Sequence, residues 1–304
     1  MKVVALAGGT GSAKLLRGLC ELDIELTVVA NVGDNFWTYG AYVCPDVDIA
    51  MYTLAGMADS KRGWGIRRDT FHALDGLTQL GEDTWFRLGD RDLATCILRT
   101  EMMRSGASLT EVTERLCGRL GATAKVLPAS DDPIETHVFT SKGDLHLQEF
   151  WVREGGRAQV TGVEYRGAGR AAPSKEVTRA IGRADRIIVC PANPVSSIGP
   201  MLAMRGFRGL LEATKAHVVA LSPMIGGAPY SGPAGKLTRA VGLDSNSAGV
   251  AKLYRGFLDT IMISEKDESE LTLIEGMGIR CLTGETRIKV QADALRLAKE
   301  LLEA

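Results

Sequence analysis

Near the start of the chain, short apolar runs alternate with an amphipathic stretch. Residues 2–7 and 24–30 are predicted to form strands, and residues 13–22 between them are predicted to form a helix. This order is a β-α-β unit, which places two parallel strands in one sheet. The second strand runs into a polar turn over residues 31–35. Ligands of open α/β sheets gather at such strand ends, so we expect a binding site there.

The pattern changes in the middle of the chain. The region is predicted to form three helices, over residues 67–80, 91–105 and 108–121. The last helix opens with a capping box made by Ser108 and Glu111. Because no strand is predicted there, we expect residues 55–123 to form a helical insertion subdomain. Residues 124–152 alternate apolar and polar positions, which predicts an antiparallel or mixed sheet with a hairpin at residues 142–144.

The α/β alternation returns in the second half. Strands are predicted over residues 186–190, 217–221, 260–263 and 279–282, and helices over residues 174–184, 207–215, 234–241, 248–257, 268–276 and 286–303. No Pro/Ser-rich linker divides the chain. We therefore predict an α/β fold in which residues 1–304 form a single nucleotide-binding unit. Its core is expected to be Rossmann-like and three-layered, with a mainly parallel sheet and the inserted helical subdomain.

Composition and charge narrow the classes of function. The chain has 304 residues, 45% of them hydrophobic, and a net charge of −1 without a basic block, which argues against a nucleic-acid partner. No apolar run approaches the ~18 residues of a membrane span, and no signal-peptide pattern is evident. The six cysteines lack C-x-x-C spacing. We expect free thiols in a cytoplasmic protein, with no membrane partner.

The first strand ends in a glycine-rich loop made of Gly8, Gly9, Thr10 and Gly11, with Lys14 one turn into the following helix. Helix N-terminal N–H groups and a lysine together predict a phosphate site. The loop matches neither of two known fingerprints, because Lys14 replaces the third glycine of G-x-G-x-x-G and the Walker pattern is absent. The alternative is a glycine turn required only for packing.

Two acidic residues follow at Asp46 and Asp48. In an extended segment, side chains two residues apart point to the same side. Two carboxylates so placed repel each other unless a cation lies between them or one is protonated. Oxygen ligands beside a phosphate site favour Mg2+. The sequence thus predicts that Asp46 and Asp48 bind Mg2+, and the alternative is a solvated loop with two acids.

A third polar cluster follows Arg87, in the segment RLGDRDLAT. Asp90 and Asp92 are explained equally well as the acidic first turn of a helix. Arg87 lies outside that turn, and its planar guanidinium suits a phosphate or a polar ring.

Two later strands also end in small polar residues. Asn193, Ser196 and Ser197 follow the strand at 186–190, whereas Gly232 and Lys236 follow the strand at 217–221. Lys236 follows a glycine just where a helix is predicted to begin, a position similar to that of Lys14 near its helix start. A second phosphate cradle on the same sheet predicts a ligand with two phosphates or a nucleotide. Glycine-rich turns without a ligand are the alternative.

Other chemistries receive less support. The histidines are widely separated, and neither a metal-spaced Cys/His set nor a G-x-S-x-G motif is present. A dinucleotide-dependent oxidoreductase is disfavoured by the missing third glycine and by Ala30-Asn31, which stand where an acidic residue would end the second strand. Trp37 and Trp64 flank the polar clusters and are candidates for stacking a flat ring, with core or rim packing as the alternative.

Several segments, taken in order, resemble one known family. They are LAGGTGSAKLLRGL, CPDVDIAMYTLAG, GWGIRRDTF, LGDRDLATCILR, SDDPIETHV, NPVSSIGP and SPMIGGAPYSGPAGKL. Together they resemble the 2-phospho-L-lactate transferases of coenzyme F-420 biosynthesis, from Val3 to about Phe257, and the LGDRD and SDDP motifs are the specific part. The opening loop and the SIGP segment also resemble the bacterial gluconeogenesis factors. These bind nucleotide sugars and are regulatory, so a nucleotide-sugar-binding regulator is the alternative function.

The resemblance implies a cytoplasmic, Mg2+-dependent homodimeric transferase. It would move the 2-phospholactyl group from (2S)-lactyl-2-diphospho-5'-guanosine to 7,8-didemethyl-8-hydroxy-5-deazariboflavin (Fo), giving coenzyme F-420-0 and GMP. By the same resemblance, Asp48 and Arg87 match positions that contact Fo. Asp46 lies beside the metal and the phosphates, and residues 191–199 and 222–236 surround the nucleotide. A lactyl donor and its enolpyruvyl relative stay open at this point.

The implied reaction assigns roles to the candidate residues. Phosphoryl-type transfer needs mostly positioning and charge neutralisation. Asp46, Asp48 and Lys14 are therefore the expected catalytic residues. Lys14, the loop amides and Lys236 are expected to neutralise diphosphate oxygens, and Asn193, Ser196, Ser197 and Gly232 to contact the nucleotide.

Overall fold

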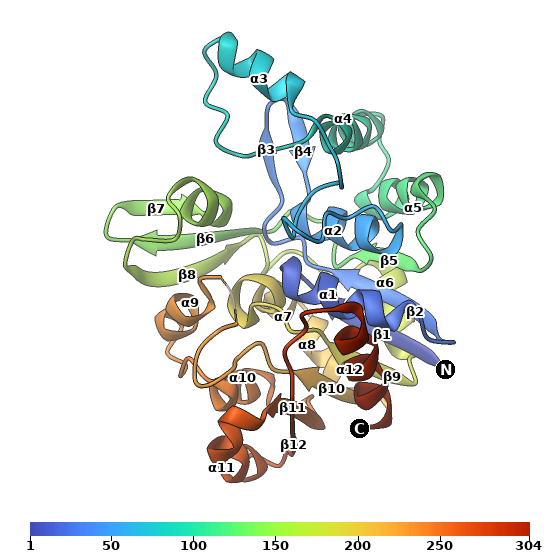
Figure 1. The fold of residues 1–304 in the computed structure, drawn as a ribbon, viewed down its shortest axis with the longest axis vertical. Helices are drawn as coiled ribbons and strands as arrows, with labels where there is room; N and C mark the ends of the chain where they lie inside the picture. Colours follow the sequence, from blue (N-terminus) through green and yellow to red (C-terminus); the bar gives the residue numbers. More distant parts are fainter. Residues whose placement is uncertain (231) are drawn as a thin grey trace.

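A seven-stranded parallel sheet forms the centre of the computed structural model, which describes residues 1–230 and 232–304 (Figure 1). Its strands are β1 (Lys2–Ala7), β2 (Glu25–Ala30), β5 (Lys125–Pro128), β9 (Arg186–Val189), β10 (His217–Leu221), β11 (Thr260–Ser264) and β12 (Arg280–Gly284). They are ordered β12-β11-β10-β9-β1-β2-β5, and every neighbouring pair is parallel. The predicted α/β fold with a mainly parallel sheet is confirmed. Position 231, inside the predicted nucleotide segment 222–236, lies outside the described residues.

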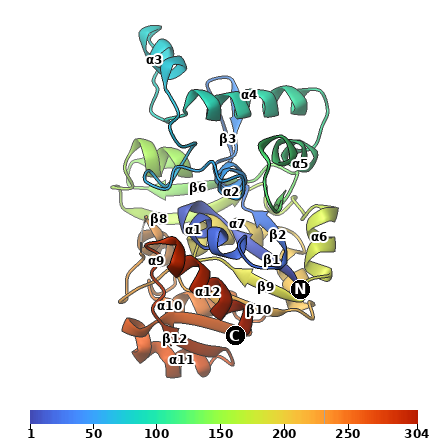
Figure 2. The ribbon, with the colours of Figure 1, turned by 45° about the vertical axis from the view of Figure 1, so that its right-hand side comes forward.

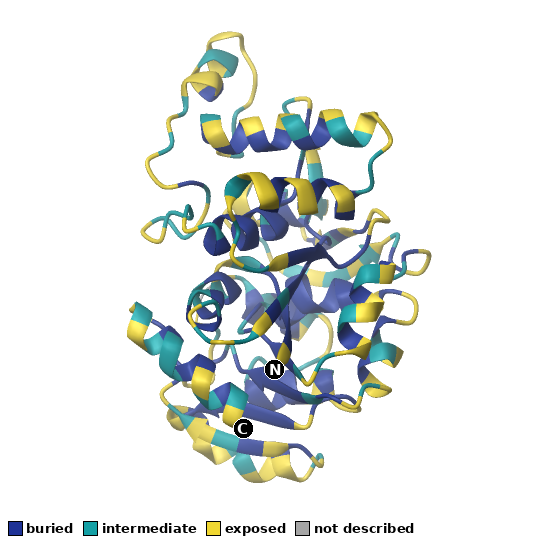
Figure 3. Cartoon of the chain, turned by 90° about the vertical axis from the view of Figure 1, so that its right-hand side faces the viewer, coloured by how far each residue is buried: buried dark blue, intermediate teal, exposed yellow. Residues whose placement is uncertain are grey.

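The central strands form the core of the molecule. β11 is buried along its whole length, and β1 is buried at every position after its first residue (Figure 3). Parallel strands covered by helices on both faces read as continuous apolar runs, which is why the sequence located them well. All six cysteines are free thiols, as predicted.

Helices cover both faces of this sheet (Figure 2). They are α1 (Gly9–Leu19), α2 (Pro45–Leu54), α5 (Leu109–Leu120), α6 (Lys175–Gly182), α7 (Gly199–Ala203), α8 (Phe207–Glu212), α10 (Ser247–Tyr254), α11 (Leu271–Glu275) and α12 (Gln291–Glu303). Helix α9 (Ala234–Ala240) packs instead against the strand at residues 160–166. Within the described residues, none of the helices has both the length and the apolar character needed to cross a bilayer. β2, the strand that follows β1 in the sequence, lies on one side of β1 in the sheet, whereas the later strands β9 and β10 lie on its other side. This reversal makes the carboxyl end of β1 a topological switch point, where ligands of such sheets bind.

The three helices predicted in the middle of the chain are present as α3 (His72–Gln79), α4 (Asp90–Arg104) and α5 (Leu109–Leu120). The capping box is confirmed, because Ser108 accepts from the Glu111 amide and the Glu111 side chain accepts from the Ser108 amide. The sequence missed a small hairpin of β3 (Phe36–Thr38) and β4 (Ala41–Val43). With α3 and α4 it stands at one end of the molecule (Figure 1).

A second sheet contains β6 (Glu135–Thr140), β7 (Gly143–His146) and β8 (Val160–Arg166), all antiparallel. The predicted hairpin is confirmed by the pairing of Thr140 with Gly143. Two details of the prediction for residues 124–152 are wrong. β5 joins the central parallel sheet beside β2, and residues 149–153 form a short π-helical turn in place of a strand.

The predicted extended segment around Asp46 and Asp48 is in fact the first turn of helix α2. Pro45 occupies the first helical position, where its fixed φ suits a helix start, and acids are favourable there. Every residue of α2 after Pro45 is buried. A helix buried on all sides lacks the polar face that marks a helix in sequence, which explains the error.

Close packing of α1 on α12 gives a test of the fold. A Cβ added at Gly18 would lie 2.1 Å from the Ala294 carbonyl oxygen of α12, whereas one added at the exposed Gly118 of α5 would meet nothing within 4 Å. Gly18→Ala should lower the free energy of unfolding by about 1–3 kcal/mol because the backbones must separate. Gly118→Ala should raise it by about 0.5–1 kcal/mol. Urea unfolding of both variants measures the difference, and equal midpoints would contradict the described helix contact.

Candidate active site

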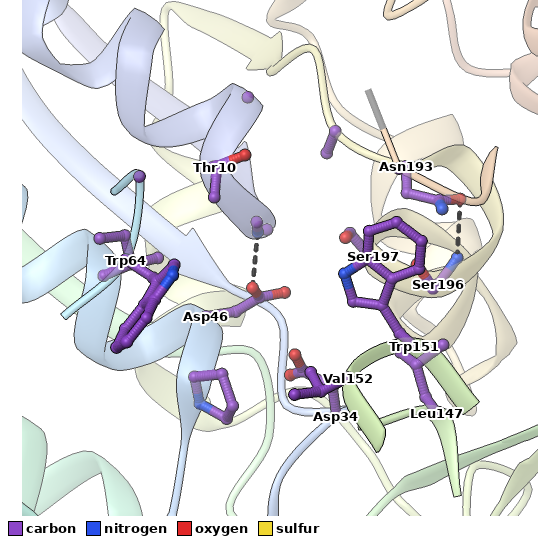
Figure 4. A pocket seen from close by; sticks show the side chains of 18 of the residues that line it. Thr10, Asp34, Asp46, Trp64, Leu147, Trp151, Val152, Asn193, Ser196 and Ser197 are labelled. Carbon is purple, nitrogen blue, oxygen red and sulfur yellow. Dashed lines mark hydrogen bonds between the residues drawn. The ribbon is translucent and has the colours of Figure 1, made fainter. Parts of the chain in front are cut away.

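A cavity of about 670 Å³ opens at the carboxyl ends of the central strands, at the switch point (Figure 4). It is lined by the glycine loop after β1, the start of α2, and the segments after β9 and β10. Further lining comes from residues 63–65 and 85–88, within the predicted insertion, and from Leu147, Gln148, Trp151 and Val152, which follow β7 of the second sheet. The site thus combines all three parts of the fold.

The glycine loop is tightly packed against its neighbours. A Cβ at Gly11 would lie 2.1 Å from the Pro191 carbonyl oxygen, and one at Gly8 would lie 2.7 Å from Asp46 Oδ2. The Gly8 N–H donates to Ser12 Oγ at 2.9 Å, and the Gly9 N–H donates to Asp46 Oδ1 at 2.6 Å. The next amides belong to the first turn of α1, whose N–H groups have no partner inside the helix. The Thr10 and Gly11 amides are therefore the donors that the loop offers to an anion.

The two predicted lysines have different surroundings. Lys14 lines the cavity, with its ammonium 4.8 Å from the centre of the Tyr230 ring. Lys236 is not among the residues that line the cavity. Its Nζ donates to the Gly156 carbonyl at 2.7 Å and to the Arg157 carbonyl at 3.0 Å, which ties α9 to that loop. In this arrangement the Lys236 ammonium is directed to the backbone of residues 156–157 and not into the cavity.

Asp46 and Asp48 are both buried and both line the cavity, but their carboxylates have separate partners. Side chains two residues apart on an α-helix differ in direction by about 200°. Asp46 accepts from Gly9 and, at 3.0 Å, from Asn31 Nδ2. Both oxygens of Asp48 accept from the Arg99 guanidinium, Oδ2 at 3.1 Å from Nη1. The geometric reason for a cation shared by Asp46 and Asp48 is therefore absent.

The acid that accompanies Asp46 is Asp34, in the turn after β2. Asn31 Nδ2 donates to Asp46 Oδ2 and, at 3.5 Å, to Asp34 Oδ1, while Gln148 Nε2 donates to Asp34 Oδ2 at 2.9 Å. Burial raises the pKa of Asp46 to about 6. Burial, and then the charge of Asp46, raise the pKa of Asp34 well above its usual value. The sequence indicated a binding turn here but did not single out Asp34.

Arg99 of α4, which the sequence did not reveal, supports the site by binding Asp48 but is not among the residues that line the cavity. It is fully buried, and its Nη1 also donates to the Tyr42 carbonyl at 3.2 Å. Burial raises the pKa of Asp48, and the positive charge of Arg99 opposes that rise. A buried guanidinium is tolerated only with such a partner. An arginine within a helix usually faces solvent, so no local signal marked it.

The LGDRD segment separates into structural and cavity residues. Asp90 accepts from the Thr70 hydroxyl and from the His72 and Ala73 amides, which fixes the start of α3. Asp92 is buried, lines the cavity and accepts from the Tyr52 hydroxyl at 2.8 Å. Both acids lie in the first turn of α4, as the helix-start interpretation predicted, and Asp92 also lines the cavity.

Arg87 also lines the cavity, and its guanidinium lies 4.6 Å from the centre of the Phe71 ring. The stacked arginine stands at the insertion side of the cavity. That position leaves its polar edge available for a ligand.

The predicted nucleotide residues Asn193, Ser196, Ser197 and Gly232 all line the cavity. Asn193 Oδ1 accepts from the Val195 and Ser196 amides at 3.0 and 3.1 Å, so it opens the short helical turn that carries both serines. Asn193, Ser196 and Ser197 lie across the cavity from Trp64 (Figure 4), and Ser197 packs against the glycine loop.

Aromatic side chains form two walls of the cavity. Trp64 stands on one side and Trp151 on the other (Figure 4). Trp37, the other candidate for ring stacking, does not line the cavity and packs on Tyr42 with ring centres 5.1 Å apart. Trp151 was missed because its segment was predicted as a strand. The walls suit planar rings at both sides of a polar floor.

Comparisons with known proteins agree with this geometry. The chain is 42% identical to a 2-phospho-L-lactate transferase of Methanosarcina acetivorans over 98% of its length and 97% of the relative. It is 41% identical to a phosphoenolpyruvate transferase of Streptomyces griseus over 100% of its length and 99% of the relative. A solved member of the UPF0052 family from Bacillus halodurans shares the fold, with a TM-score of 0.65 and 17% identity over 99% of this chain and 98% of that one.

The family described as 2-phospho-L-lactate transferase CofD matches residues 3–303. The match includes the glycine loop, the buried acids and the aromatic walls. Because it spans nearly the whole chain, and because the relatives above are about as long as this protein, the chain belongs to the 2-phospho-L-lactate transferase family.

Proposed function

We propose that the protein transfers the 2-phospholactyl group of (2S)-lactyl-2-diphospho-5'-guanosine to the ribityl hydroxyl of Fo, releasing GMP, and that it acts as a homodimer. The full-length family match carries this proposal. A phosphate loop and buried acids in one cavity support it. The alternative, a nucleotide-sugar-binding regulator, is not favoured, since the relatives described above are named as transferases.

The arrangement of charge fits a group transfer between two bound substrates. Lys14 and the Thr10 and Gly11 amides would neutralise diphosphate oxygens at the switch point. The serines after β9 and the segment at Gly232 would contact the guanosine. The acceptor would occupy the insertion side, beside Asp48 and Arg87 and between aromatic walls. Since such transfers depend on positioning and charge neutralisation, the cavity supplies the main requirements.

Mg2+ is the proposed cofactor, and the residues fit it. Asp34 and Asp46 are buried carboxylates that share the Asn31 amide, and a hard cation prefers such oxygen ligands beside phosphates. We propose that these two acids hold the ion, in place of the Asp46 and Asp48 pair expected from the sequence. When bound, Mg2+ would neutralise charge on the diphosphate. Asp48, whose oxygens both accept from Arg99, would serve the acceptor.

Turnover tests the function directly. Incubation with Fo, Mg2+ and the lactyl donor should yield GMP and a product heavier than Fo by the phospholactyl group, measured by mass spectrometry. Without Fo, little GMP should form, because the bound acceptor hydroxyl and not water is the proposed nucleophile. A parallel reaction with the enolpyruvyl donor compares the two acids. Absence of GMP with both donors would contradict the transferase proposal. If the enolpyruvyl donor reacts faster than the lactyl donor, the enolpyruvyl compound becomes the proposed donor.

The two lysines provide a matched pair for donor binding. Lys14→Ala should weaken GDP binding by about 1.5–3 kcal/mol, the usual contribution of a hydrogen bond to a charged group. Lys236→Ala should leave GDP affinity unchanged, because its ammonium is bound to two carbonyls away from the cavity. Isothermal calorimetry measures both constants. Equal losses in the two variants would show that the loop around α9 approaches the diphosphate after all.

The metal assignment predicts a specific response to Mg2+. Asp34→Asn and Asp46→Asn should each raise the Mg2+ concentration for half-maximal rate by at least about tenfold, since each removes a charged oxygen ligand. The exposed Asp75→Asn on α3 is the control and should not change it. Calorimetric titration of Mg2+ into the GDP complex gives a readout independent of turnover. Unchanged Mg2+ affinity in both cavity variants would rule out this pair of ligands.

A further inference from the structure

Asp92 is a cavity acid with one carboxylate oxygen that accepts no hydrogen bond from the described residues. Its Oδ1 accepts from the Tyr52 hydroxyl, and no donor to Oδ2 is found in the described part of the chain. Both oxygens of Asp48 accept from Arg99. Both oxygens of Asp34 and of Asp46 accept as well. Among these four buried acids, Asp92 alone presents a carboxylate oxygen that is committed to no protein donor in residues 1–230 and 232–304.

Residues 63–65 form a short segment, the strap, that lies between Asp92 and the phosphate loop. Residues 63–65 line the cavity, and both glycines of the strap have positive φ, 80° and 66°. A Cβ at Gly63 would lie 3.6 Å from the Thr10 methyl carbon, and one at Gly65 would lie 3.6 Å from Asp92 Oδ2. Residues two apart span at most about 7 Å. Asp92 Oδ2 therefore lies at one end of the strap and the phosphate loop at the other, and both line the same cavity.

The surroundings of Asp92 suit proton transfer near neutral pH. Burial raises the pKa of Asp92 to about 7, and the charges of Asp48 and Asp69 add to this rise. The Tyr52 hydrogen bond and the charge of Arg99 oppose it. Cys96 Sγ and oxygens of Asp48 and Asp92 lie within 4.8 Å of one another, and burial raises the pKa of the Cys96 thiol, which keeps it protonated. A base is most effective when its pKa is close to the working pH.

We propose that Asp92 is the general base that takes the proton of the acceptor hydroxyl in the transfer reaction. The inference rests on the proposed function. The hydroxyl O–H bond breaks and its proton moves to Asp92 Oδ2. The hydroxyl oxygen forms a bond to the phosphorus that carries the lactyl group. The bond from that phosphorus to the GMP phosphate oxygen breaks, and GMP leaves with the electron pair.

Asp92→Asn, compared with Asp90→Asn, tests the assignment within one motif. Asparagine keeps the shape of the side chain but cannot accept the proton. Asp92→Asn should lower kcat by about 10²- to 10⁴-fold, the usual contribution of a general base, with KM for Fo changed little. Asp90→Asn should keep near-normal kcat, because Asp90 lies outside the cavity lining and only fixes the start of α3. GDP affinity and thermal melts are measured for both.

Tyr52→Phe gives a second readout, which a purely structural role would not move. The base must be ionised to act, so kcat should rise with pH through the pKa of Asp92. Loss of the Tyr52 hydrogen bond removes support for the carboxylate, and the acidic limb of the kcat profile should therefore move to higher pH. The pH profile of Tyr52→Phe therefore tests the role of Asp92 even if Asp92→Asn fails to fold.

The outcomes separate the two proposals. A kcat near the wild-type value in folded Asp92→Asn, a raised KM with unchanged kcat, or an unshifted acidic limb in Tyr52→Phe would overturn the role of Asp92. In each of these cases the wild-type rate still supports the transferase. If the wild-type protein forms no GMP from either donor, the proposed function itself fails.

Discussion

The ion pair between Asp48 and Arg99 is the constraint on which the rest of the site depends. Arg99 is fully buried, so removing Asp48 would leave an uncompensated charge inside the protein, at a cost of about 3–5 kcal/mol. Asp48 belongs to α2 of the core, and Arg99 belongs to α4 of the insertion. Their hydrogen bonds fix one helix against the other. The positions of Arg87, just before α4, and of Asp92, at its start, follow from that attachment.

The cavity contains two different electrostatic environments. At the switch point of the sheet, backbone N–H groups at the start of α1 and the ammonium of Lys14 provide positive potential for phosphates. On the insertion side, buried carboxylates and a stacked guanidinium face the same cavity between Trp64 and Trp151 (Figure 4). A transfer between two substrates requires such a division, because donor phosphates and acceptor hydroxyls need opposite electrostatic environments. Residues 63–65, 85–88 and Asp92, within the segment predicted as an insertion, thereby contribute to the site.

The sequence predicted most of the sheet but fewer side-chain roles. The buried parallel strands have clear apolar runs, and the capping box at Ser108 marks a local hydrogen bond, so both were found. Helix α2 was missed because it is buried on all sides and has no solvent-facing polar stripe. The side-chain direction of Lys236 cannot be read from a glycine-lysine pair, which specifies only the backbone. Arg99 and Asp34 act through partners distant in sequence, and only the folded chain brings those partners together.

A crystal structure with GDP, Mg2+ and Fo bound would test the central claim, that one cavity aligns the donor phosphates with the acceptor hydroxyl. The account predicts terminal phosphate oxygens about 3 Å from the Thr10 and Gly11 amides. It also predicts the primary hydroxyl of Fo at hydrogen-bonding distance from Asp92 Oδ2 and directed toward that phosphate. A diphosphate bound away from the glycine loop, or an Fo chain directed away from Asp92, would contradict it.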